Sequence, residues 1–89
     1  MMPAYRVLVP PRVERQMARI AEPHRGRIFQ ALRRLATDPR PAGSRKLVNH
    51  DDAYRIRVGD YRVIYEVEHR RITVTITKIG HRSAIYRDI

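Results

Sequence analysis

The segment 54–67 constrains the fold of this chain more than any other stretch. It reads YRIRVGDYRVIYEV. Apolar and polar residues alternate on both sides of Gly59-Asp60, which is the pattern of two half-buried strands joined by a two-residue turn. Such a turn fixes the register of the hairpin, so Arg57 faces Arg62 and Ile56 faces Val63. The sequence therefore predicts an antiparallel hairpin.

This hairpin is expected to have one apolar face and one basic face. The apolar face carries Tyr54, Ile56, Val58, Tyr61, Val63 and Tyr65. The basic face carries Arg55, Arg57 and Arg62. Arg57 and Arg62 lie directly across from each other, and like charges in that position destabilise a sheet. An anion bound over the three guanidinium groups would relieve the repulsion, so this face is a candidate anion-binding surface.

The composition also points to an anionic partner. The 89 residues include 19 Lys and Arg against 9 Asp and Glu, for a net charge of +10. This balance is typical of proteins that bind nucleic acid, an anionic surface or an acidic protein. A codon bias toward arginine would raise the charge too, but it does not account for a cross-strand arginine pair. The chain has no cysteine, which excludes disulfides and thiolate metal sites and fits a reducing compartment.

We expect residues 1–89 to form a single cytoplasmic domain, because no apolar run resembles a signal peptide or a membrane span. The expected elements before the hairpin are a strand over Tyr5–Val9, an amphipathic helix over Arg12–Ala21, a second helix from Pro23 to about Ala36 or Thr37, and a loop over 40–53. The short connection between the helices predicts an antiparallel helical hairpin. His50, Asp51 and Asp52 are interpreted as solvated turn residues, not as a metal site.

A third strand is expected to follow the hairpin. If His69-Arg70 is a two-residue loop, Tyr65 pairs with Val74, Val63 pairs with Ile76, and Thr77 lies opposite Arg62. The third strand then ends beside the Gly59-Asp60 turn and delivers the segment GHRSAIYR, residues 80–87, to the basic corner. The whole is a two-layer α+β domain with an N-terminal strand, a helical hairpin, a three-stranded antiparallel meander and a short C-terminal tail. The helices cover the apolar face, and the other face stays open.

This corner has the residue types that metal-independent RNA cleavage needs. The 2′-hydroxyl loses a proton and attacks the phosphate, the 5′-oxygen gains a proton, and negative charge builds on the phosphate. Fixed guanidinium groups lower that barrier, and Arg57, Arg62 and Arg82 are the candidates. His81 is the candidate for proton transfer, because histidine titrates near neutrality. Tyr86 would donate a proton or stack on a base; alternatively it anchors the C-terminal tail, unless Ile85 does so.

Several motifs together resemble the RelE toxins of bacterial and archaeal toxin–antitoxin pairs. They are DPRP at 38–41, Lys46-Leu47, the hairpin at 54–67, IGHR at 79–82 and IYR at 85–87. The resemblance implies a RelE-like fold and a ribosome-dependent mRNA endonuclease that needs no cofactor. The family's basic catalytic residues fall on Arg55, Arg57 and Arg62, and its C-terminal arginine and tyrosine fall on Arg82 and Tyr86. The best-known RelE has lysines where this chain has Arg55 and Arg57. Other relatives carry a histidine near the C-terminus, and this resemblance implies that His81 is the proton-transfer group here; the alternative is weakened cleavage.

The resemblance also implies partners. A cognate acidic, RelB-like antitoxin would wrap and silence the toxin in a hetero-oligomer, and the ribosome and mRNA would be its targets, with no membrane involved. Lys46, Lys78 and Arg87 are the expected RNA-binding residues. Two alternatives stay open: a non-enzymatic inhibitor of DNA gyrase, similar to the ParE relatives, and a degenerate member that only binds RNA or antitoxin.

Overall fold

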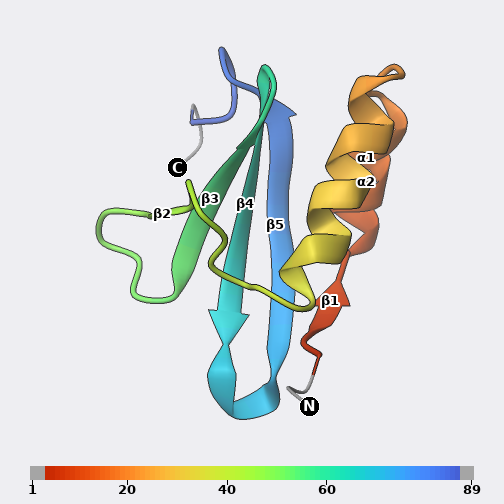
Figure 1. The fold of residues 1–89 in the computed structure, drawn as a ribbon. Coiled ribbons are helices and arrows are strands. Elements are labelled where there is room, and N and C mark those ends of the chain that lie inside the picture. Colours follow the sequence, from red (N-terminus) through yellow and green to blue (C-terminus); the bar gives the residue numbers. More distant parts are fainter. Residues whose placement is uncertain (1–3, 87–89) are drawn as a thin grey trace.

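A computed structural model describes residues 4–86 of the chain. Its elements are β1 (Arg6–Leu8), α1 (Pro11–Ala18), α2 (His24–Leu35), β2 (Arg45–Lys46), β3 (Ala53–Val58), β4 (Tyr61–Glu68), the 3₁₀-helix η1 (His69–Arg71) and β5 (Thr73–His81). Within this range the strands form one five-stranded sheet in the order β1-β5-β4-β3-β2. Both helices lie on the same side of the sheet (Figure 1). The predicted two-layer α+β fold is confirmed.

The sheet is larger than the predicted meander because two short strands join its edges. β1 pairs in parallel with β5, through Arg6 with Thr73 and Leu8 with Thr75. β2 lies in the segment expected to be a loop and pairs antiparallel with β3. Neither partner choice was predicted from sequence, since strands of two or three residues carry too little alternation to indicate a neighbour.

The β3–β4 hairpin has the predicted register. Ile56 pairs with Val63, and Arg57 pairs with Arg62 across the Gly59-Asp60 turn. Gly59 has φ +60°, a left-handed conformation that glycine adopts without steric cost. The apolar face of the hairpin packs against the helices in a core that includes Ile56, Val63, Tyr65, Val13, Met17, Ile28, Leu32 and Leu35.

The predicted register between β4 and β5 is wrong. The turn is the 3₁₀-helix η1 followed by Ile72 in the left-handed region, so Tyr65 pairs with Ile76 and not with Val74. A β-bulge between Ile64 and Tyr65 then shifts the upper half by one more residue. As a result Arg62 lies opposite Gly80, not Thr77. The bulge turns Ile79 into the core, where it is 3% exposed, and this burial favours the observed register.

Side chains from α1 cover the edge of β5 that extends beyond β1. The Oε1 atom of Gln16 accepts a hydrogen bond of 2.8 Å from the backbone N–H of Ile79. Arg12 donates from Nη2 to the carbonyl oxygen of Thr77 at 2.9 Å. These bonds satisfy backbone groups that a sheet edge otherwise leaves open to another chain.

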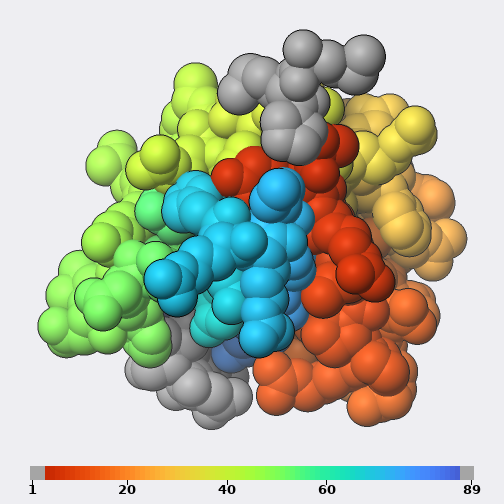
Figure 2. All heavy atoms as spheres, turned by 90° about the horizontal axis from the view of Figure 1, so that it is seen from below, coloured from red at the N-terminus to blue at the C-terminus, as the bar shows by residue number. Residues whose placement is uncertain are grey.

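At the opposite end of the sheet, the N-terminal segment lies against the turn between β4 and β5. Figure 2 shows this contact from below, with the first described residues in red beside the cyan turn. The Tyr5 hydroxyl lies 2.8 Å from Nδ1 of His69, and the two rings pack edge to face. No helix in residues 4–86 is long and apolar enough to cross a membrane.

Candidate active site

An open depression of about 430 Å³ lies where β5 ends beside the β3–β4 turn. It is lined by Arg55, Arg62, His81, Arg82, Ser83 and Tyr86. The chain after β5 curls back beside this turn (Figure 1). The structure thus brings together five of the six residues predicted to be catalytic, and it adds Ser83. The predicted corner exists, although the register used to infer it was wrong.

Arg55 and Tyr86 are joined across the depression. Nη1 of Arg55 donates a hydrogen bond of 2.6 Å to the Tyr86 hydroxyl oxygen. The guanidinium carbon also lies 5.8 Å from the centre of the Tyr86 ring. Because the guanidinium can only donate, the hydroxyl oxygen is the acceptor and its own proton is left to donate to another group.

Tyr86 is held in place by its neighbour, Ile85. Ile85 is 1% exposed, whereas Tyr86 is 40% exposed, so Ile85 is the anchor of the C-terminal segment. A Cβ added to Gly80 would lie 3.2 Å from Cδ1 of Ile85, which shows how closely this side chain approaches the β5 backbone. The apolar anchor therefore presents Tyr86 to the depression.

Arg62 is buried, with 6% of its surface exposed. Its Nη1 atom donates to the carbonyl oxygens of Gly59 at 3.0 Å and Tyr61 at 2.9 Å. These bonds fix the guanidinium against the hairpin turn. They also provide hydrogen-bond acceptors for a buried charge that lies opposite another cation, Arg57. The expectation of a fully open basic face is therefore wrong at this position and at Ile64, which is 4% exposed.

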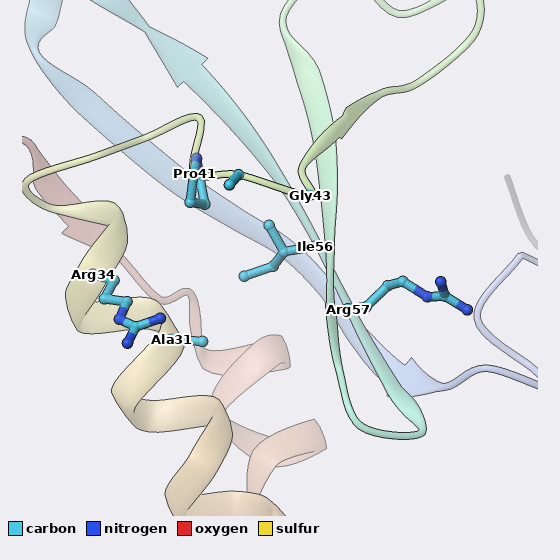
Figure 3. Close-up of a pocket in the computed structure, with 7 residues that line it drawn as sticks. Ala31, Arg34, Pro41, Gly43, Ile56 and Arg57 are labelled. Atoms are coloured by element: carbon cyan, nitrogen blue, oxygen red, sulfur yellow. The ribbon is translucent and has the colours of Figure 1, made fainter.

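Arg57 projects from the same face of the sheet as Arg62 but does not line the depression. Figure 3 shows Arg57 pointing away from α2, while its neighbour Ile56 points toward the helix. The Arg57 side chain is exposed. It supplies positive charge beside the depression and has no side-chain hydrogen bond among those found in residues 4–86.

His81 lines the depression, and its imidazole is held by contacts with Tyr61 and Ser83. His81 pairs with Tyr61 across β4 and β5, and its ring packs edge to face on Tyr61 at 5.6 Å. The backbone N–H of Ser83 donates to Nδ1 of His81 at 3.1 Å, and Oγ of Ser83 lies 2.9 Å from the same nitrogen. A nitrogen that accepts from a backbone amide carries no proton, so the neutral ring holds its proton on Nε2. His81 is therefore arranged as a hydrogen-bond donor.

Arg82 forms an ion pair with the hairpin turn. Its Nε atom lies 3.6 Å from Oδ1 of Asp60, and both side chains are more than 60% exposed, at 63% and 62%. Its backbone N–H also donates to the carbonyl oxygen of Asp60 at 2.7 Å. An exposed pair of this kind contributes little stability, so Arg82 is available to exchange Asp60 for another anion.

The three predicted RNA-binding residues have different positions. Lys78 pairs with Ile64 and shares the face of the arginines, because the β-bulge reverses the alternation that would have placed it in the core. Lys46 pairs with Tyr54 and is therefore on the opposite face, whereas Arg45 pairs with Arg55. Arg87 lies outside the described residues. An RNA-binding role for these residues stays a prediction.

Sequence reasoning missed Ser83, Asp60 and Arg45. The contacts of Ser83 and Asp60 depend on how the C-terminal segment folds back, which no periodic pattern indicates. Arg45 belongs to a strand of two residues. Its sequence signal is its closeness to Lys46, the predicted RNA-binding residue beside it.

Comparison with known families decides the affiliation of the chain. A family model described as "ParE toxin of type II toxin-antitoxin system, parDE" matches residues 7–86. The chain belongs to the RelE/ParE superfamily of type II toxins. The predicted resemblance to RelE toxins is confirmed at this level. No curated protein shows a significant sequence match to this RelE/ParE member.

Solved structures of RelE toxins share the fold of this RelE/ParE member. The archaeal RelE of the RelE–RelB complex from Pyrococcus horikoshii OT3 is 31% identical, with a TM-score of 0.80 over 89% of this chain and 96% of that chain. The toxin–antitoxin complex RelBE2 from Mycobacterium tuberculosis contains a chain of 20% identity and TM-score 0.79, with 93% and 97% covered. A free mutant of E. coli RelE is 23% identical, with a TM-score of 0.77 and 91% and 86% covered. The last two show the fold alone.

Proposed function

We propose that this RelE/ParE toxin is an endoribonuclease that cleaves mRNA on the ribosome and so inhibits translation. The observation that carries the proposal is the hydrogen bond of 2.6 Å from Arg55 to the Tyr86 hydroxyl, over a depression that Arg62 and Arg82 also line. A tyrosine proton and three guanidinium groups face one open space. Structural similarity to RelE toxins, one of them 31% identical, supports the same reading.

The reaction is a transfer within the RNA backbone. The 2′-oxygen bonds to phosphorus, the bond from phosphorus to the 5′-oxygen breaks, and a 2′,3′-cyclic phosphate is left. The attacking hydroxyl gives its proton to water, which reaches the open depression, and the departing 5′-oxygen takes the proton of Tyr86. Arg55, Arg62 and Arg82 stabilise the charge that builds on the phosphate oxygens; loss of one fixed donor typically costs about 100- to 1000-fold in rate. His81 donates from Nε2 to the same phosphate.

The proposal includes a partner and a place of action. RelE structures from several organisms contain a RelB antitoxin, so we expect a RelB-like protein to bind this chain and suppress it. With a net charge of +10, the toxin favours an acidic antitoxin. Cleavage of mRNA on ribosomes would place the active toxin in the cytoplasm.

The test is induced expression followed by mapping of mRNA 5′ ends, in cells and with purified programmed ribosomes. We expect new 5′ ends within coding regions and a halt in translation, with wild-type behaviour for Arg33→Ala on the exposed side of α2 and little cleavage by Tyr86→Phe. Intact messages and normal translation would refute the proposal.

The ParE description of the family model supports one alternative, inhibition of DNA gyrase without RNA cleavage. The same expression experiment separates the two functions. Induction of the DNA damage response with unchanged mRNA ends would establish the alternative. The convergence of Arg55, Arg62, Arg82 and Tyr86 favours RNA cleavage, because a purely binding protein has no need of a hydroxyl held by a guanidinium.

A further inference from the structure

We infer that the RNA strand crosses this sheet from β2 to β5, at right angles to the strands, and that Arg45 and Arg12 bind its backbone at the two ends of the path. The inference rests on the proposed function and adds a binding path to it. Arg45 and Arg12 lie outside the depression that holds the candidate catalytic residues.

The path begins with a row of side chains that the sheet register places side by side. Arg45 pairs with Arg55, Arg55 pairs with Ile64, and Ile64 pairs with Lys78. Paired residues share a face, so three cations lie on one line across four strands. With strands about 4.8 Å apart, the row extends over roughly 14 Å.

Like charges are adjacent twice on this face. Arg45 lies across from Arg55, and Arg57 lies across from Arg62. Each arrangement disfavours the folded sheet on its own account. A phosphate backbone laid along the row would reduce the repulsion between Arg45 and Arg55. The second pair, Arg57 and Arg62, lies two residues further along the same strands.

Acidic residues bound the path on one side. The next position on β4 after Ile64 on this face is Glu66, followed by Glu68. A strand of RNA running along β4 would pass over both carboxylates, although Arg71 lies 3.5 Å from the carboxylate of Glu68. An RNA strand that crosses the β-strands keeps its phosphates over Arg45, Arg55 and Lys78 and away from Glu66 and Glu68. The charges of the sheet therefore set the direction of the path.

Arg12 continues the row beyond β5. It reaches from α1 to the carbonyl of Thr77 on the free edge of β5. It also lines a second depression of about 220 Å³ on this face. Leu47, His50, Ala53, Ile64, Glu66, Thr77 and Lys78 complete the lining. The buried Ile64 and Ala53 give this depression an apolar floor suited to the flat face of a base, with Arg12 and Lys78 beside it.

The test measures binding of an uncleavable 2′-O-methyl RNA oligonucleotide by fluorescence anisotropy over a range of salt concentrations. We expect Arg45→Ala and Arg12→Ala each to weaken binding at low salt about two- to fivefold, as for loss of one exposed ion pair. Each should also lower the slope of log K against log salt by about 0.7, the value for one phosphate contact on a single strand. Glu66→Gln should bind as tightly as the wild type or more tightly. Arg33→Ala is the matched control for loss of one positive charge.

The outcomes separate this path from the proposed function. Wild-type slopes for Arg45→Ala or Arg12→Ala, or an equal loss in Arg33→Ala, would overturn the path while leaving cleavage on ribosomes untouched. A wild-type protein that cleaves mRNA but does not bind the oligonucleotide would overturn it as well. Conversely, a lower slope of log K against log salt in both Arg45→Ala and Arg12→Ala, together with no mRNA cleavage by the wild type, would support the path and refute the endonuclease. The charge reversal Arg45→Glu should weaken binding further than Arg45→Ala.

Discussion

The guanidinium of Arg55 and the hydroxyl of Tyr86 meet at 2.6 Å, although 31 positions separate them in the chain. Arg55 lies in the middle of β3, and Tyr86 follows β5 in a segment that curls back toward the hairpin turn. The contact depends on two anchors: the β3–β4 register, which sets Arg55 on the basic face, and Ile85, which is buried beside Gly80. The candidate chemistry depends on both.

The first prediction concerns this pair. We expect Tyr86→Phe and Arg55→Ala each to reduce mRNA cleavage about 100-fold, since each removes one positioned group from the transition state. The double variant should lose much less than the product of the two effects, because the residues act as a unit. Single-turnover cleavage on programmed ribosomes measures this, with Arg33→Ala as control. Fully multiplicative losses would mean that the two residues act independently.

The second prediction concerns His81. If its Nε2–H donates to the phosphate, His81→Gln, which places an amide N–H near the same point, should retain cleavage close to the wild type. His81→Ala should lose up to about tenfold, the value of one hydrogen bond. Rates for both variants should show the same dependence on pH as the wild type between pH 5 and 8. Equal losses of 100-fold or more, with a flattened pH profile, would assign proton transfer to His81.

The third prediction concerns the anchor of the C-terminal segment. Ile85→Ala removes a side chain that is 1% exposed, and we expect a loss of about 2–4 kcal/mol in the free energy of unfolding. Cleavage should fall even at temperatures where the variant is fully folded, because Tyr86 loses its support. Ile85→Val, which removes one methylene, is the conservative comparison and should cost about 1 kcal/mol. Folded Ile85→Ala protein with wild-type cleavage would show that Tyr86 is positioned by other contacts.

The fourth prediction concerns stability at alkaline pH. Burial raises the pKa of Tyr65 from 10.0 to about 12, with the Ser44 hydrogen bond acting in the opposite direction. The folded protein therefore favours the neutral phenol, and this contribution is complete below pH 10 and is lost as the pH rises toward 12. Tyr65→Phe removes the bond of 2.8 Å to the carbonyl of Pro39 and should cost about 1 kcal/mol at neutral pH. The difference from the wild type, followed by urea unfolding from pH 8 to 12, should shrink above pH 10; a constant difference would contradict the shifted pKa.

Local sequence determined the central hairpin and its faces. The alternation over 54–67 and the Gly59-Asp60 turn act between neighbours in the chain, so the register and the two faces followed without knowledge of the rest of the fold. The burial of Arg62 and Ile64 did not follow from this local pattern. The same local logic placed two helices on the apolar face and brought the end of β5 to the hairpin turn. The charged and aromatic residues of the candidate site were identifiable because they belong to these elements or follow them directly.

Tertiary structure decided the register of β5, the partners of β1 and β2, and the orientation of His81. Three residues of η1 form the turn where two were expected, and the bulge beside Ile64 shifts the strand so that Ile79 is buried. Burial in a shared core depends on packing between residues that are far apart in the chain, and alternation within one strand does not reveal which of them is buried. For the same reason, the shared face of Lys78, Arg45 and Arg55 depends on the register of four strands and cannot be read from any one of them.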